Sequence, residues 1–247
     1  MSYTNFAAFY DGLQANVDYK ARAAHIIGLF KKYDRLPTLL LDLACGTGGF
    51  SLEMAKAGID VIGVDSSVEM LNVARQKCFE QKANVLLLCQ SAEKLDLYGT
   101  VDGAICCLDS VNHIIDENEL LESFKKVSLF LEKDRLFIFD VNSEYKHRKV
   151  LSGNVFVGET EDVFYAWRNS DCDEKGVVDI RLDFFQRLEN GYYQRSFEEF
   201  SERAYLSDEL EKMLDKAGLQ TVAVLGDMSE TEPSESEERI IYVTRKR

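Results

Sequence analysis

Three glycines follow an acidic residue at the end of an apolar run, and this pattern suits the binding of a nucleotide-like ligand. Residues 38–50 read TLLLDLACGTGGF, so the run ends near Asp42 and the glycines stand at positions 46, 48 and 49. Such a run is typical of a buried parallel strand, and the glycines let backbone amides approach a ligand closely. Apolar positions at helical spacing continue to Gly58, so the turn is expected to open a helix whose N-terminus favours negative charge.

A second acidic residue marks the end of the next predicted strand. Residues 59–64 read IDVIGV and are followed by Asp65. In α/β nucleotide-binding folds a carboxylate about twenty residues beyond the glycines holds the ribose through its hydroxyl groups. The dinucleotide fingerprint also needs a third glycine, but Ser51 occupies that position. The spacing therefore argues against a nicotinamide cofactor.

The combination of Asp42, Gly46, Gly48 and Asp65 resembles the first two motifs of class I S-adenosylmethionine-dependent methyltransferases. The resemblance implies that Gly46 and Gly48 lie beside the methionine part of the cofactor and that Asp42 supports the glycine loop. It also implies that Asp65 binds the ribose hydroxyls. Ala44, in the same loop, is expected to contact the cofactor.

The same resemblance implies that the adenine lies at the end of the third predicted strand, residues 84–90. Many members of the family carry an acid where Ser91 stands, and a hydroxyl accepts a hydrogen bond from the adenine amine more weakly. The implied adenine contacts are Gln90, Ser91, Ala92, Ser66 and Met70. Ser66 and Glu69 also have the spacing of a capping box, so the next helix is expected to begin there.

A polar cluster follows the fourth predicted strand, residues 101–108. By resemblance this segment runs beside the transferred methyl group, with Leu108 against the cofactor. Asp109, Asn112 and His113 are therefore candidates to orient the methyl acceptor or to take its proton. The ordinary pKa of histidine suits a base that works near neutral pH.

These candidate residues lie in the loops of a predicted α/β sheet. Residues 18–33 have helical periodicity, Ser207 is expected to cap another helix, and further strands are expected at residues 134–141, 220–225 and 239–244. Parallel strands that alternate with helices make a doubly wound sheet. The predicted fold is a mostly parallel, seven-stranded, Rossmann-like methyltransferase fold whose last strand is antiparallel.

The pattern changes after residue 141, where long β-type runs replace the alternation. Strands are expected at residues 155–157, 162–168, 177–188 and 192–200, with Asn190-Gly191 as a hairpin turn. A strict two-residue turn would oppose Asp183 to Glu198, whose like charges repel, so a bulge is expected. The predicted organisation is a core domain of residues 1–141 and 205–247 with an antiparallel β insertion, a lid, of residues 142–204.

The insertion and the N-terminal segment resemble a narrower group of small bacterial methyltransferases with a β lid after the fifth strand. This resemblance implies that Tyr10 and Tyr19 close with the lid over the cofactor and the acceptor. Arg203, next to the core domain, is a candidate to grip an anionic acceptor, because a guanidinium binds carboxylate or phosphate through two hydrogen bonds.

The composition limits the partners of the protein. The 247 residues carry 29 Lys and Arg against 43 Asp and Glu, and the net charge of −14 repels nucleic acids and anionic membranes. No apolar run is long enough to span a bilayer and no signal peptide is visible, so a cytoplasmic protein is expected. The six cysteines form no Cys-x-x-Cys pair and the three histidines share no metal-ligand spacing, so reduced thiols and no metal are expected.

The predicted activity is the S-adenosylmethionine-dependent transfer of a methyl group to a nitrogen or an oxygen of a small molecule. Because the cofactor already activates the methyl group, such an enzyme mainly has to orient the acceptor and exclude water. Two alternatives stay open: a nicotinamide-dependent oxidoreductase, and a non-catalytic protein that binds S-adenosylmethionine.

Overall fold

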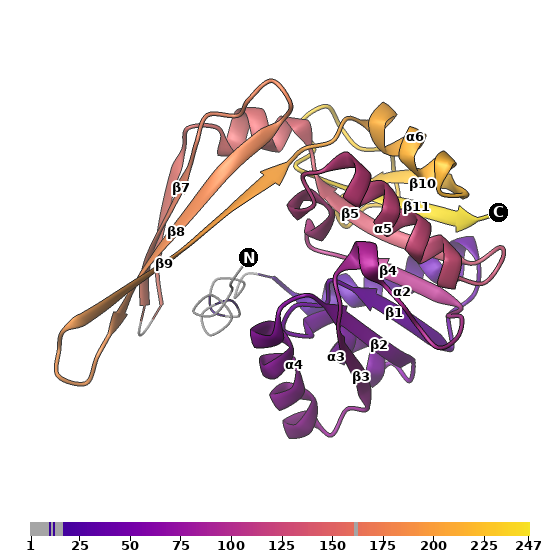
Figure 1. Ribbon diagram of the computed structural model, residues 1–247, viewed down its shortest axis with the longest axis horizontal. Helices are drawn as coiled ribbons and strands as arrows, with labels where there is room; N and C mark the ends of the chain where they lie inside the picture. Colours follow the sequence, from indigo (N-terminus) through magenta and orange to yellow (C-terminus); the bar gives the residue numbers. More distant parts are fainter. Residues whose placement is uncertain (1–9, 11, 13–16, 161–162) are drawn as a thin grey trace.

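The structure, a computed structural model, describes residues 10, 12, 17–160 and 163–247 (Figure 1). Within these residues one sheet contains the strands β1 (Leu39–Leu43), β2 (Asp60–Asp65), β3 (Val85–Cys89), β4 (Gly103–Cys106), β5 (Leu136–Asn142), β10 (Leu219–Gly226) and β11 (Arg239–Lys246). Their order in the sheet is β10-β11-β5-β4-β1-β2-β3. Strands β1 to β5 pair in parallel, and β11 runs antiparallel to both β5 and β10. The predicted seven-stranded, mostly parallel fold is confirmed.

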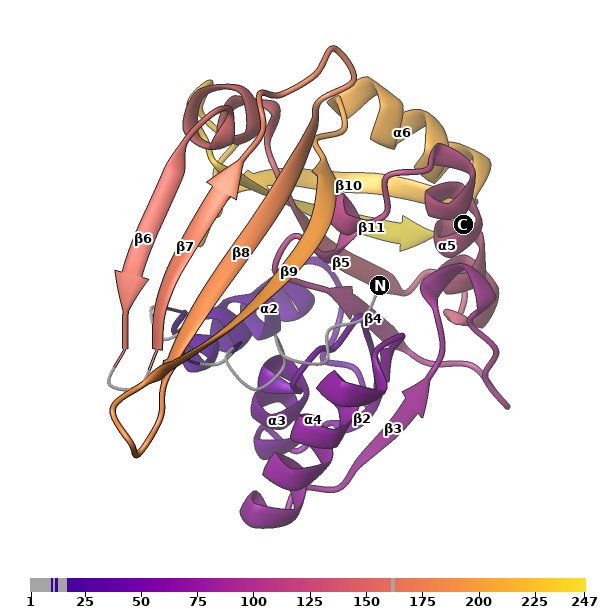
Figure 2. The same ribbon diagram turned by 60° about the vertical axis from the view of Figure 1, so that its left-hand side comes forward.

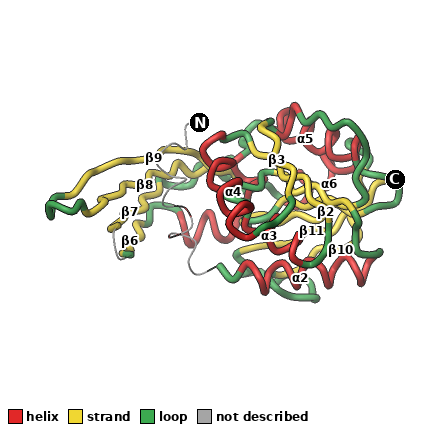
Figure 3. The backbone as a smooth tube through the Cα atoms, turned by 90° about the horizontal axis from the view of Figure 1, so that it is seen from below, coloured by secondary structure: helices red, strands yellow, loops and turns green. Residues whose placement is uncertain are grey.

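Helices cover both faces of this sheet, and Figure 3 shows α2 and α5 on opposite sides of it. The helices are α2 (Tyr19–Tyr33), α3 (Gly49–Lys56), α4 (Val68–Gln81), α5 (Glu117–Phe130) and α6 (Ser207–Lys216). Leu40 packs in the apolar core under α2 and α3, whereas Leu41 and Leu43 pack in the core under α5 and α6. Successive side chains of a strand point to opposite faces, so each strand supplies both cores. In the described part of the chain, no helix has the length and apolar character that crossing a membrane requires.

Stacked aromatic rings fill the core behind β5. The ring centroids of Phe137 and Phe139 lie 5.1 Å apart, and the ring of Phe139 stacks on Tyr242 of β11 at the same distance. Phe124 of α5 packs against both phenylalanines. This stack holds β5 rigidly between its neighbours, so the polar residues at the carboxyl end of β5 have a fixed position.

Replacing Phe139 by alanine removes the centre of this stack and leaves a cavity. We expect Phe139→Ala to lower the free energy of unfolding by about 3–5 kcal/mol, measured by urea denaturation. Leu129 of α5 is 61% exposed, so Leu129→Ala serves as the control and should change the same quantity by less than about 0.5 kcal/mol. Equal losses in the two variants would contradict this description of the core.

A second, antiparallel sheet contains β6 (Val155–Glu159), β7 (Val163–Asn169), β8 (Val177–Arg187) and β9 (Tyr193–Arg203), paired in that order. Figure 2 shows this sheet standing beside the seven-stranded sheet. We call it the lid sheet. Asp183 lies opposite Phe197 and not Glu198, so the like charges are separated as expected. The extra residue lies in the hairpin turn, where Gly191 has a φ of +81°, and not within the ladder.

Two helix starts differ from the predicted ones. Ser67, not Ser66, caps α4, because its Oγ accepts a hydrogen bond of 3.1 Å from the backbone N–H of Met70. Ser207 is the first residue of α6 and not its cap; its hydroxyl is bonded to the hydroxyl of Tyr242 at 2.6 Å. Both predictions were wrong by one residue, since several neighbouring residues could cap and tertiary contacts decide between them.

The cysteines are free thiols, as expected. Burial raises the pKa of Cys45, Cys106 and Cys107 well above the ordinary value. These thiols therefore stay protonated, which makes them poor nucleophiles and poor metal ligands.

Candidate functional site

A cavity of about 1120 Å³ opens between the carboxyl ends of the parallel strands and the lid sheet. This edge is where open α/β sheets bind their ligands. Most of the residues predicted to bind a cofactor or an acceptor line the cavity: Tyr10, Ala44, Gly46, Asp65, Ser66, Met70, Gln90, Ser91, Ala92, Leu108, Asp109 and His113. The topology thus brings together four loops that are far apart in the sequence.

The carboxylate of Asp65 holds the glycine loop. Its two oxygens accept hydrogen bonds of 2.8 Å from the backbone N–H groups of Gly46 and Ser67. Burial raises the pKa of Asp65, and these two hydrogen bonds partly oppose that rise. Gly46 has a φ of +53°, and a Cβ built there would meet no atom within 4 Å, so its backbone faces open space in the cavity. The loop is therefore held from one side and open to a ligand on the other.

Asp42 supports the same loop from behind and does not line this cavity. It is 2% exposed, and the hydroxyl of Ser51 donates a 2.5 Å hydrogen bond to it. Burial raises the pKa of Asp42 to about 7, although the hydrogen bond from Ser51 opposes the shift. Gly48 has a φ of +79° and lies against Ala74 of α4, so it also shapes the loop without reaching the cavity.

Tyr19 packs on the glycine loop. A Cβ at Gly49 would overlap the Tyr19 ring, and this ring meets Phe50 edge to face at 5.6 Å. Tyr19 and Asp42 line a small neighbouring cavity of about 30 Å³ and not the larger one. The predicted acceptor contact is thus placed against the loop that was expected to bind the cofactor.

The turn after β4 has a strained backbone that one carboxylate stabilises. Leu108 and Asp109 have φ values of +58° and +54°. The two oxygens of Asp140, on β5, accept hydrogen bonds of 2.8 and 2.7 Å from the N–H groups of Leu108 and Asp109. Left-handed conformations of residues other than glycine are unfavourable and persist where the surroundings impose them, often at functional sites.

Arg239 of β11 binds both carboxylates at this turn. Its guanidinium donates to Asp140 and, at 2.6 Å, to Asp109. Burial alone would raise the pKa of Asp109, but the charges of Arg239, Lys146 and His113 lower it to about 2. Asp109 is therefore a carboxylate at every physiological pH.

The short helix η2 (Ser110–His113) follows this turn and presents His113 to the cavity. Asn112 is fully buried; its amide donates to the carbonyls of Asn142 and Arg203 and accepts from the N–H of Asn142. The guanidinium of Arg203 forms ion pairs with Glu117 at 2.9 Å and Glu209 at 3.2 Å. Asn112 and Arg203 do not line the cavity; they tie β5, β9 and η2 together around it.

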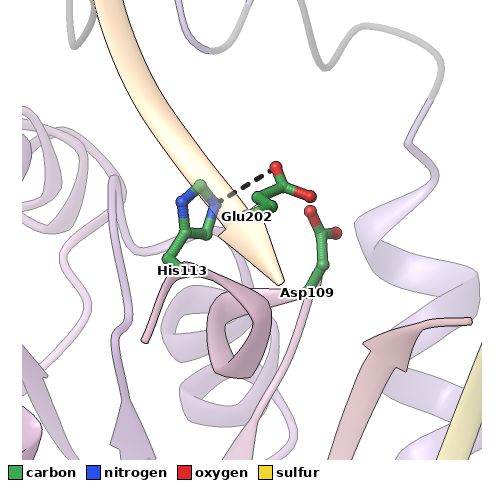
Figure 4. Close-up of side chains that lie close together, drawn as sticks. All are labelled: Asp109, His113 and Glu202. Carbon is green, nitrogen blue, oxygen red and sulfur yellow. Dashed lines mark ion pairs between the residues drawn. The ribbon is translucent and has the colours of Figure 1, made fainter. Parts of the chain in front are cut away.

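Glu202 of β9 joins Asp109 and His113 in a cluster that Figure 4 shows in close-up. One side-chain atom from each of the three lies within 4.8 Å of the others. Glu202 Oε1 is 3.7 Å from His113 Nε2, and Glu202 Oε2 is 3.6 Å from Nε2 of His147, which belongs to η3 (Lys146–Leu151). Within the described residues, His113 Nδ1 is buried without a hydrogen-bond partner. The cluster can bind a cation or accept a proton.

Several of these residues were not predicted from the sequence. Asp140 interrupts an apolar strand near its carboxyl end, which is the pattern that singled out Asp42 and Asp65, so the signal was present. Glu202 and Arg239 belong to no local motif and reach the site only through the antiparallel strands β9 and β11. The histidine spacing predicted no metal, yet the fold places His113 close to two carboxylates of the type that coordinate divalent cations.

Glu93 changes the expected adenine site. The hydroxyl of Ser91 donates a 2.6 Å hydrogen bond to Glu93, which also lines the cavity. Burial acts to raise the pKa of Glu93, but the pKa is lowered overall, mainly because the Ser91 hydroxyl donates a hydrogen bond to the carboxylate. An acid is therefore present two residues after the position where the family commonly carries one.

Comparison with known proteins decides the family. Residues 40–134 match a family described as a methyltransferase domain. The chain is 30% identical to a putative methyltransferase of Geobacillus sp. (strain WCH70) over 100% of both chains. It is 33% identical to the putative methyltransferase YqeM of Bacillus subtilis (strain 168), over 100% of this chain and 98% of that one. The chain belongs to the methyltransferases.

A solved structure identifies the cofactor of this methyltransferase. The crystal structure of an S-adenosylmethionine-dependent methyltransferase from Clostridium acetobutylicum ATCC 824 is similar with a TM-score of 0.89 and 36% identity, covering 99% of this chain and 98% of that one. The enzyme is thus an S-adenosylmethionine-dependent, class I methyltransferase, and neither the oxidoreductase nor the non-catalytic alternative describes it.

The residues of the methyltransferase fit this cofactor. The open backbone at Gly46 leaves room for a ligand beside the glycine loop, and the Asp65 carboxyl lines the same cavity. The sulfonium and amino groups of S-adenosylmethionine are cationic, which suits a cavity lined by more acids than bases.

Removing the Asp65 carboxylate should weaken cofactor binding. We expect Asp65→Ala to lower the affinity for S-adenosylhomocysteine roughly tenfold or more in calorimetry, because the loop loses two hydrogen bonds to a charged group. Asp60→Ala, an exposed position on the same strand, is the control and should leave the affinity unchanged. An unaltered affinity in Asp65→Ala would refute the assigned role of this carboxyl.

The pKa of Asp42 predicts a dependence of stability on pH. Its folded value of about 7 exceeds the ordinary value of 3.8, so between these values the folded state keeps a proton that the unfolded state has lost. The stability due to neutral Asp42 is therefore lost as the pH rises through this window.

Asp42→Asn cannot ionise and should escape this loss. We expect the melting temperature of Asp42→Asn, relative to that of the wild type, to rise between about pH 4 and pH 7 and to stay level above pH 7. Calorimetric scans across pH 4–9 measure the difference. A difference that does not change between pH 4 and pH 7 would show that Asp42 titrates normally.

Proposed function

We propose that this methyltransferase transfers the methyl group to an amine nitrogen of a small molecule. The observation that carries the proposal is the cluster of Asp109, His113 and Glu202 at the cavity. Two carboxylates attract an ammonium group and repel a carboxylate or phenolate acceptor. His113 beside them carries ring nitrogens, one of which can take the proton that the acceptor nitrogen must lose before it reacts.

The two arginines among the described residues at the cavity are paired with aspartates, and Lys146 donates to the Asn142 side chain at 2.9 Å, so Glu202 is the acid left for an amine. Arg22 is bound to Asp227 at 2.7 Å, and Arg239 is bound to Asp109 and Asp140. Glu202 is 3% exposed, and its ion-pair partners among the described residues are histidines. Glu202 is therefore a buried carboxylate without a permanently cationic partner, and an ammonium group would supply one.

The residues act in a simple order. When bound, the cofactor supplies an electrophilic methyl group on its sulfonium sulfur. Glu202 and Asp109 accept hydrogen bonds from the ammonium group and orient the nitrogen. His113 accepts one proton, which frees the nitrogen lone pair for attack along the S–CH₃ bond. The lid sheet limits the access of water to this reaction.

The cofactor contacts and the role of the lid are part of the proposal. The lining residues Ala44, Gly46, Asp65, Ser66, Met70, Gln90, Ala92 and Leu108 would hold the cofactor, and Tyr10 would cover it. Glu93, with Ser91 bonded to it, would accept the hydrogen bond from the adenine amine. Residues 142–204 would act as the lid over both cofactor and acceptor.

The charge of Glu202 provides the test. Glu202→Gln keeps the size and the acceptor oxygen of the side chain but removes its charge. With radiolabelled S-adenosylmethionine and a panel of primary amines, we expect kcat/KM to fall roughly tenfold to hundredfold for the best amine. Glu199→Gln on the outer face of the same strand is the matched control and should keep the wild-type value.

Two further measurements make the result unambiguous. Calorimetry with S-adenosylhomocysteine should give the same affinity for both variants, which shows that the fold is intact. Dialysis against EDTA should leave activity unchanged, because the cluster binds an ammonium group and not a metal ion. Full activity of Glu202→Gln, or loss of activity in EDTA with recovery on adding a divalent cation, would contradict the amine assignment.

A further inference from the structure

The lid sheet carries a second recognition surface beside the amine cluster. We propose that it binds a flat, apolar body, so that the acceptors are arylalkyl amines and not amino sugars or amino acids. This inference rests on the proposed amine function and adds to it the chemical class of the substrate.

Aromatic side chains form one continuous surface on the inner face of the lid sheet. Phe156, Tyr165, Trp167 and Phe200 all line the cavity. Phe156 lies directly opposite Trp167 in the strand ladder, and their rings meet edge to face at 6.1 Å. Trp167 in turn lies opposite Leu182, another residue of the cavity wall. Residues opposite one another in a ladder share a face, so these side chains make one apolar wall of the cavity. Glu198, opposite Leu182 on β9, shares this face but does not line the cavity.

The wall begins at the proposed reaction centre. The ring of Phe200 lies 5.1 Å from the imidazole of His113. Phe200 and Glu202 are two residues apart on β9, so both face the cavity. An amine bound by Glu202 therefore has its carbon skeleton next to Phe200 and directed along the wall toward Trp167.

The rings of the wall have room for a partner. Val178, Ile180 and Phe184 of β8 are fully buried, but Phe156 is 38% exposed and Trp167 is half-buried. The indole N–H of Trp167 already donates to Asn169 at 2.7 Å. The polar edge of the indole is therefore occupied, and what it offers to the cavity is apolar ring surface. Aromatic rings in such positions gain from stacking and from burial.

Hydroxylated or anionic acceptors suit this wall poorly. The lid-sheet strands contribute Phe156, Tyr165, Trp167, Leu182, Phe200 and Glu202 to the cavity, and most of these side chains offer no hydrogen bond to a sugar hydroxyl. The carboxylate of an amino acid would meet Glu202 in the same cavity, and this acid has no permanently cationic partner, whereas Asp109 and Asp227 are paired with arginines. The wall and the acids together select a cationic head on an apolar body.

Comparison of three amines tests the inference. Phenethylamine carries the ring, glucosamine carries hydroxyls, and glycine carries a carboxylate; each has a primary amine. With radiolabelled S-adenosylmethionine we expect kcat/KM for phenethylamine to exceed the other two values at least about tenfold. Trp167→Ala should lower the phenethylamine value roughly tenfold, while Trp167→Phe, which keeps a ring, should retain most of it.

Phe164 provides the matched control. Phe164 lies three residues before Trp167 on β7 and is 39% exposed. Its ring packs on Phe185 at the outer face of the lid sheet. Phe164→Ala should leave phenethylamine methylation unchanged. All three variants should bind S-adenosylhomocysteine like the wild type, which excludes a folding defect.

Fluorescence gives a readout that does not depend on catalysis. The chain has one tryptophan, so its emission reports on Trp167 alone. With S-adenosylhomocysteine present, 4-nitrophenethylamine should quench this emission saturably. The quenching should be stronger in Phe164→Ala than in Phe200→Ala. Free N-acetyltryptophanamide serves as the control for collisional quenching.

The possible failures are distinguishable. Equal methylation of glucosamine or glycine, or full activity of Trp167→Ala, would overturn the aromatic subsite and leave amine methylation standing. If no amine is methylated, the proposed function fails, and the titration decides the subsite: saturable quenching supports it, and quenching no stronger than that of free N-acetyltryptophanamide overturns it.

Discussion

The proposed acceptor side of the site depends on the hydrogen bonds and the ion pair of the buried Asp140 carboxylate. It accepts hydrogen bonds from Leu108 and Asp109 and binds Arg239, so it joins the ends of β4, β5 and β11. The chain can make its left-handed turn after β4 because these bonds offset the strain. The turn then sets the direction of η2, and with it the position of His113. The stacked rings behind β5 matter for function because they hold Asp140 in place.

Buried aspartates that accept hydrogen bonds also stabilise the proposed cofactor side. Asp42 on β1 and Asp65 on β2 also stand near the carboxyl ends of parallel strands, and each accepts hydrogen bonds from the glycine loop or the helix that follows it. Burial raises the pKa of both. A carboxylate next to arginine behaves differently: Asp109 has its pKa lowered to about 2 despite its burial. The groups around each aspartate thus give side chains of the same type different pKa values.

Much of the proposed cofactor side could be located from the sequence because its signals are local. The apolar strands, the glycine loop and Asp65 stand close together in the sequence, and so does the alternation that predicts the lid sheet. The acceptor side was less predictable, because Glu202 and Arg239 arrive from distant antiparallel strands. Their positions depend on strand register, which no local motif specifies. The sequence indicated Ser91 where many members of the family carry an acid, but it did not single out Glu93. The importance of Glu93 became visible in the folded geometry, where the Ser91 hydroxyl donates a hydrogen bond to its carboxylate.

In the proposed mechanism Glu202, Asp109 and His113 hold the nitrogen that receives the methyl group. The most direct test is a crystal structure with S-adenosylhomocysteine and the best amine acceptor found in labelling experiments. We expect the amine nitrogen to lie within hydrogen-bond distance of Glu202 or Asp109 and next to His113, on the side of the cofactor sulfur from which the methyl group leaves. An amine nitrogen bound elsewhere, with a metal ion or a water cluster between these three side chains, would contradict it.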